Sequence, residues 1–203
     1  MVKSLYNTFK HWTNGGSAWI ISDTHFDDPD CKNMDERWIS SEEQVNIINK
    51  HVYRNDYLIH LGDVGNPEWL EKLKCNNRVL ITGNHDKPHL LTPYFSEVYI
   101  GPLFIADRIL LSHEPIMGLE DFCVNIHGHD HNGIERNNHI NLAANVCNYT
   151  PLSLGASIKS GILTNCKNYH RVTIDSIPKK NNLSKKSFLQ LQTIENEYAT
   201  MRT

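Results

Sequence analysis

Short apolar runs alternate with helical patterns in the first half of the chain. Runs rich in isoleucine, leucine and valine predict buried strands at residues 18–22, 57–61 and 78–82. Between them, residues 42–53 and 67–75 have the spacing of amphipathic helices. The first helix has Ser40 or Ser41 as its cap and two glutamates in its first turn. Because strands and helices alternate, we predict a largely parallel sheet with right-handed crossovers.

After Pro88 the pattern changes to closely spaced strands. We predict strands at residues 97–101, 103–105, 108–112, 123–127 and 139–143, with a turn at Asn132-Gly133. Such short connections favour a mixed or antiparallel sheet. A helix at about residues 152–163 and a short edge strand at 169–174 are also expected.

Both ends of the chain differ from this central part. Residues 1–17 end near a Gly-Gly pair and show no sustained period, so we predict an N-terminal extension, followed by one domain over 18–175. Residues 176–203 are predicted to hold a lysine-rich linker and an amphipathic helix, whose apolar face contains Phe188, Leu191, Ile194, Tyr198 and Met201. We interpret this face as packing on its own domain, with homo-oligomer contacts as the alternative.

Composition narrows the class of protein. The 203 residues are 39% hydrophobic and 21% charged, which excludes disordered, collagen-like and coiled-coil chains. The sequence has no apolar run long enough to span a membrane. Its five scattered cysteines, with no Cys-x-x-Cys pair, fit a reducing cytoplasm. A net charge of −3 argues against binding to polymeric nucleic acid. We expect a soluble cytoplasmic protein that acts on a small substrate.

The 12 histidines cluster with aspartate, asparagine and glycine where predicted strands end, at residues 22–25, 61–63, 83–86 and 126–131. Because the carboxyl ends of strands in an open α/β sheet converge on one crevice, we expect a shared site. The spacing of Asp23 with His25, and of His129 with His131, predicts two pairs on extended backbone, each able to grip one ion.

The mixture of imidazole, carboxylate and amide groups predicts transition metals. Manganese is the first choice and iron, zinc or nickel are alternatives, since magnesium and calcium prefer all-oxygen ligands. The clusters contain more ligands than one ion needs. Two cations about 3.5–4 Å apart, bridged by a carboxylate, could clamp a displacement at phosphorus.

The ordered series Asp-x-His, Gly-Asp, Gly-Asn-His-Asp, a lone His113 after a strand, and Gly-His-x-His resembles the calcineurin-like metallophosphoesterase superfamily. The resemblance covers residues 18–155. Within the superfamily, this stretch is similar to the small prokaryotic and phage phosphoesterases. It implies an α/β fold, a layered sandwich of two packed mixed β-sheets flanked by helices. Two positions depart from the pattern: Asp28 replaces a histidine, and Asn145 stands where an acidic residue is frequent.

The resemblance also implies a role for each motif residue. It implies a first metal held by Asp23, His25 and His131, and a second held by Asn84, His113 and His129, with Asp63 bridging. A metal-bridging hydroxide would be the nucleophile. Asn84 and His85 would contact the phosphoryl group, and His85 would protonate the leaving group while Asp86 orients its imidazole. From the chemistry of guanidinium, Arg37 is a candidate phosphate clamp.

These inferences predict a metal-dependent phosphoester hydrolase. We favour a phosphodiesterase acting on a small or nucleotide-like substrate, since small relatives often prefer diesters and His85 can protonate a poor leaving group. A phosphomonoesterase of the same fold, a non-catalytic metal-binding scaffold and a DNA nuclease are the alternatives.

Overall fold

The computed structural model describes residues 17–106, 109–119, 123–133 and 138–160. The predicted N-terminal extension falls outside these residues except for Ser17. The predicted strand at 169–174, the lysine-rich linker and the C-terminal helix also lie outside them. The boundary expected at residue 175 is therefore still a prediction.

The first sheet has five strands in the order β4-β3-β2-β1-β9. They are β1 (Ala18–Ile21), β2 (Tyr57–His60), β3 (Asn77–Ile81), β4 (Glu97–Tyr99) and β9 (Leu152–Ser153). Strands β1 to β4 are parallel, which confirms the predicted parallel sheet, and β9 is antiparallel to β1. Strand β4, which we placed with the later strands, instead pairs with β3 and extends this first sheet.

The second sheet has the order β5-β6-β7-β8. Its strands are β5 (Leu103–Ala106), β6 (Ile109–Leu111), β7 (Val124–His127) and β8 (His139–Asn141). The pair β5–β6 is antiparallel, whereas β6–β7 and β7–β8 are parallel, so this sheet is mixed as predicted.

The helices differ more from the prediction. Helix α3 (Ser41–His51) is confirmed, and Ser40 with Glu43 forms a capping box at its start. The expected α-helix at 67–75 is instead a 3₁₀ helix, η1 (Pro67–Lys72), which ends where the Leu73 N–H donates to the Leu70 carbonyl. Helices α2 (Cys31–Met34), α4 (Pro88–Leu91) and η2 (Thr92–Tyr94) were not predicted.

The expected helix at 152–163 begins two residues late. Leu152 and Ser153 pair with Ile20 and Trp19 of β1, so α5 (Leu154–Ser160) starts after them. The remainder of the predicted helix lies beyond residue 160, outside the described residues.

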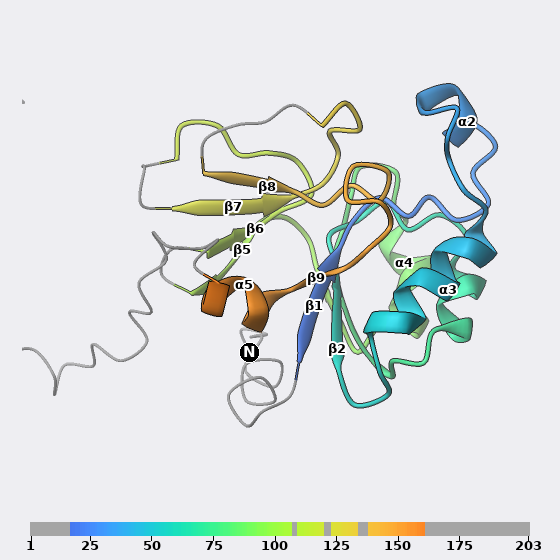
Figure 1. Cartoon of the computed structure of the whole chain (residues 1–203), viewed down its shortest axis with the longest axis horizontal. Helices are drawn as coiled ribbons and strands as arrows, with labels where there is room; N and C mark the ends of the chain where they lie inside the picture. The colour runs from blue at the N-terminus through green and yellow to red at the C-terminus, as the bar shows by residue number, and fades with distance from the viewer. Residues whose placement is uncertain (1–16, 107–108, 120–122, 134–137, 161–203) are drawn as a thin grey trace, which may run out of the picture. The chain divides into compact units, whose positions relative to one another are not determined.

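Hydrophobic side chains form two layers of core. Ile59 and Val79 of the first sheet belong to the cluster that also contains Leu111 and Ile126 of the second sheet. Leu58 and Leu80, which point to the opposite face, belong to a cluster with Val45 and Ile48 of α3. Figure 1 shows α3 and α4 on the side of β1 and β2 that faces away from β7 and β8. The layered α/β sandwich is therefore confirmed.

The two sheets meet where β1 ends. The Ser22 N–H donates to the Leu142 carbonyl (3.0 Å), and Ser22 forms a parallel bridge with Ala143. The next residue, Asp23, donates its N–H to the Gly62 carbonyl (2.9 Å) after β2. The loops that follow strands of both sheets are thereby brought together. Within the described part of the chain, no helix is long and apolar enough to cross a membrane.

Candidate metal centre

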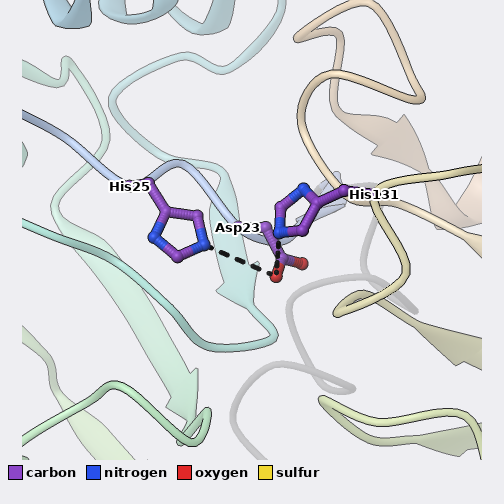
Figure 2. A group of neighbouring side chains, drawn as sticks. All are labelled: Asp23, His25 and His131. Atoms are coloured by element: carbon purple, nitrogen blue, oxygen red, sulfur yellow. Dashed lines mark ion pairs between the residues drawn. The ribbon is translucent and has the colours of Figure 1, made fainter. Parts of the chain in front are cut away.

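A first group of side chains collects where the loop after β1 meets the loop after β7. The Oδ1 atom of Asp23 lies 4.0 Å from Nε2 of His25 and 3.6 Å from Nε2 of His131. Figure 2 shows both imidazoles directing a ring nitrogen at this one carboxylate. These three residues satisfy the spacing of a metal-binding group.

Two atoms of this group are buried without a hydrogen-bond partner. They are Oδ1 of Asp23 and Nε2 of His25. Burial raises the pKa of Asp23 despite the opposing contacts of His113, Ser22, His129 and His131. Burial lowers the pKa of His25, which favours the neutral imidazole that binds metals. A divalent cation would satisfy both atoms, so these residues fit the metal that their chemistry predicts.

A second group lies beside the first and consists of Asp63, Asn84, His113 and His129. Asn84 Oδ1 lies 2.8 Å from His113 Nε2 and 3.1 Å from His129 Nδ1. The two histidine nitrogens are 3.2 Å apart. The three histidine and aspartate members also satisfy the spacing of a metal-binding group. The donor set of two imidazoles, a carboxylate and an amide oxygen suits a divalent transition metal.

Asp63 lies between the two groups. Its Oδ2 atom is 3.7 Å from His25 Nε2 in the first group and 3.3 Å from His113 Nε2 in the second. Burial favours a raised pKa, but the hydrogen bond and charge of His113 outweigh it and lower the pKa of Asp63 to about 2. Asp63 is therefore an ionised carboxylate within reach of both groups.

The backbone at these residues is unusual. Asp23, His25, Asp63 and His129 have positive φ angles of 53°, 41°, 56° and 64°. The extended backbone that we predicted at both pairs is therefore wrong, although Asp23 and His25 lie in the same group as predicted. Because the chain turns at His129, His129 and His131 join different groups instead of gripping one ion together.

Two glycines of the motifs allow the carboxylates to approach the main chain. A methyl group at Gly83 would collide with the side chain of Asp63, and one at Gly128 would collide with the side chain of Asp23. The space beside these two glycines is thus used by the aspartate side chains.

Comparisons with known proteins agree with this geometry. Residues 17–145 match the model of the calcineurin-like phosphoesterase superfamily domain. The chain belongs to the calcineurin-like phosphoesterase superfamily. A search of curated proteins found no match.

Two solved structures are similar to this superfamily member. A protein of unknown function from Aquifex aeolicus has 24% sequence identity and a TM-score of 0.59, over 71% of this chain and 99% of that chain. Nuclease MPE from Pseudomonas putida has 21% identity and a TM-score of 0.38, over 55% of this chain and 59% of the nuclease. The first of these shows that the fold is shared.

His85 and Asp86, which belong to the superfamily motif, take different places. The exposed His85 side chain lines a pocket of about 340 Å³ that also includes His25, Asp28 and Lys87. The His85 N–H donates to Asp63 Oδ1 (2.9 Å), which fixes His85 next to the metal-binding groups.

Asp86 binds backbone donors, and no contact between its carboxylate and the His85 ring is found among the described residues, so its expected role in orienting His85 is still a prediction. Its Oδ2 accepts from the N–H groups of Asp63 (2.9 Å) and Gly83 (2.8 Å), and its Oδ1 accepts from the Val64 N–H (3.0 Å). The carboxylate satisfies backbone donors of the loops after β2 and β3. Asp86 therefore braces these two loops against each other.

Arg37 is the predicted site residue that the structure does not bring to the groups. Its side chain is 84% exposed and donates to both oxygens of Asp35, at 3.1 Å each. No contact between Arg37 and a member of either group is found among the described residues. A role for Arg37 as a phosphate clamp is still only a prediction.

Sequence reasoning missed two residues that contact predicted ligands. Asp28 Oδ2 lies 3.3 Å from His25 Nδ1, and Asn145 Oδ1 lies 3.0 Å from His131 Nδ1. The signal was present, because these are the two positions at which the chain departs from the superfamily pattern.

Proposed function

We propose that this member of the superfamily is a dinuclear metal-dependent phosphodiesterase that acts on a small or nucleotide-like substrate. The observation that carries the proposal is the position of Asp63. One of its oxygens lies within 3.7 Å of a nitrogen from each group, as a carboxylate bridging two cations requires.

The two groups would hold one ion each, with manganese favoured by the mixed nitrogen and oxygen donors and iron, zinc or nickel as alternatives. Asp23, His25 and His131 would bind the first ion, and Asn84, His113 and His129 the second. When bound, such a pair supplies a water of lowered pKa and positive charge that stabilises the phosphoryl oxygens.

His85 would act as the general acid. Its side chain is exposed and lines the pocket of about 340 Å³ next to His25, so it can reach the leaving group of a substrate whose phosphoryl group lies at the centre. The volume suits a small organic group. Protonation by His85 would help an alkoxide leave from either kind of ester. We favour a diester because the chain resembles small phosphoesterases that often prefer diesters.

The test is hydrolysis of bis-p-nitrophenyl phosphate and p-nitrophenyl phosphate by metal-stripped protein, with and without Mn²⁺. We expect manganese-dependent cleavage of the diester that is lost in Asp63→Asn. Preferential cleavage of the monoester would establish a phosphomonoesterase instead. If protein that binds metal hydrolyses neither ester, the non-catalytic scaffold is favoured.

A further inference from the structure

We propose that Asp28 and Asn145 are positioning residues that fix His25 and His131 with the proton on Nδ1, and that Asp28 makes the first group the tighter of the two metal sites. The inference rests on the metal centre of the proposed function. It concerns the binding of metal rather than the reaction, so the two can be tested separately.

Asp28 favours one tautomer of the His25 imidazole. The carboxylate of Asp28 can only accept, and its Oδ2 lies 3.3 Å from Nδ1 of His25, an ion-pair contact that favours a proton on this nitrogen when the ring is neutral. The other oxygen, Oδ1, accepts from the Asp30 N–H (2.9 Å) and thereby holds the carboxylate in place. The lone pair of His25 is consequently on Nε2, the buried atom without a hydrogen-bond partner that faces Asp23 and Asp63.

Asn145 constrains His131 in the same way. Its amide nitrogen donates to the His131 carbonyl (3.0 Å) and to Asp35 Oδ2 (3.4 Å), both of which can only accept. The amide oxygen must therefore face His131 Nδ1, at 3.0 Å. This arrangement places the lone pair of His131 on Nε2, 3.6 Å from Asp23 Oδ1.

The two outer partners differ in charge, since Asp28 is a carboxylate and Asn145 a neutral amide. In the part of the chain that the structure describes, neither a carboxylate nor an amide side chain is found at the distal nitrogen of His113. Nδ1 of His113 lies 3.0 Å from the backbone carbonyl of Leu61, a neutral acceptor. Among the described residues, Asp28 is the carboxylate that faces the distal nitrogen of a histidine in either group. A carboxylate partner increases the basicity of an imidazole and strengthens its bond to a metal. We therefore expect the first group to bind its ion more tightly than the second.

The test is calorimetric titration of full-length, metal-stripped protein with Mn²⁺. The wild type should show two binding events of unequal affinity. Asp28→Asn keeps an oxygen for the Asp30 N–H but removes the charge, and should weaken the tight event about 10- to 100-fold while changing the weak one less than about twofold. Asp30→Asn, which alters an exposed carboxylate with no contact to either group, is the matched control and should leave both events unchanged.

Asn145→Ala provides a second variant, and should weaken the same tight event. Thermal unfolding of the metal-free proteins accompanies the titrations. A residue that serves only folding would lower the melting temperature without weakening the tight binding event more than the weak one. The proposal is overturned if both variants titrate like the wild type, if both events weaken equally, or if the wild type binds no Mn²⁺. If the wild-type protein binds two ions but cleaves neither ester, the proposed function is contradicted and the inference about metal binding is not.

Discussion

The two metal-binding groups differ in burial and in how closely their atoms approach. In the first, Asp23 and His25 are 0% and 4% exposed, and the facing atoms stand 3.6 to 4.0 Å apart. In the second, Asn84 and His129 are exposed and the facing atoms stand 2.8 to 3.3 Å apart. In the first group the distal nitrogens of His25 and His131 contact Asp28 and Asn145, whereas atoms of the second group hydrogen-bond to one another. A cation must break those bonds to enter the second group, so similar ligands need not give similar sites.

Removing one ligand from each group should have the largest effect. Because both ions are needed to stabilise charge at phosphorus, Asp23→Asn and His113→Ala should each lower the rate of diester cleavage about a thousand-fold. The two variants should differ in metal binding, which calorimetric titration can measure. His113→Ala should keep the tight site and lose the weak one, and the reverse result would contradict our ranking of the groups.

His85 should affect turnover without affecting either group. His85→Ala removes the proposed proton donor, and should lower the rate of cleavage of a diester with a poor alkoxide leaving group at least about a hundred-fold. Metal content measured by mass spectrometry should be unchanged. His89→Ala, an exposed histidine in α4, serves as the control. Loss of metal in His85→Ala would make His85 a ligand.

Two glycine variants should destabilise the protein by a steric clash, each with a different aspartate of the metal centre. Gly128→Ala would press a methyl group against Asp23, and Gly83→Ala would press one against Asp63. Each should lower the free energy of unfolding by about 1–3 kcal/mol, as overpacking does. Urea unfolding measures this loss. Gly101→Ala meets no atom within 4 Å and has a positive φ of 89°, so it measures the cost of backbone strain without a clash. Gly83 and Gly128 have no positive φ, and wild-type stability in their alanine variants would rule out the clash.

His60 should have the smallest effect, because it is buried near the centre but belongs to neither group. Burial lowers its pKa from 6.5 to about 4, so the unfolded chain takes up a proton at a higher pH than the folded chain. The stability due to a neutral His60 is present above about pH 6.5 and is lost as the pH falls toward 4. Urea unfolding of His60→Gln between these values should show a shallower loss with falling pH than the wild type. If the free energies of unfolding of the two proteins fall in parallel with pH, His60 is not a source of the pH dependence.

The sequence predicted the regular parts of the fold and the residue types of the site. Continuous apolar runs identify β1, β2 and β3, and a serine cap at Ser40 or Ser41 followed by two glutamates identifies the start of α3, since these signals are local. Strand β9 was missed because its two residues are defined only by pairing with β1, over a hundred residues earlier.

The same limit applies within the site. The spacing of His129 and His131 suggested a pair, but the positive φ at His129 separates them, and a spacing rule assumes extended backbone. Asp86 was assigned to His85, its neighbour in sequence, yet it binds backbone N–H groups of Asp63 and Val64. Contacts between loops decide both cases, and no local pattern encodes them.

The central claim is that Asp63 joins the two groups into one dinuclear centre. Titration of Asp63→Asn with Mn²⁺, beside the wild type, tests it most directly. A shared carboxylate predicts two ions per chain in the wild type and weakened binding at both sites in the variant. A variant that keeps one site at wild-type affinity would contradict the claim, because Asp63 would then serve a single ion.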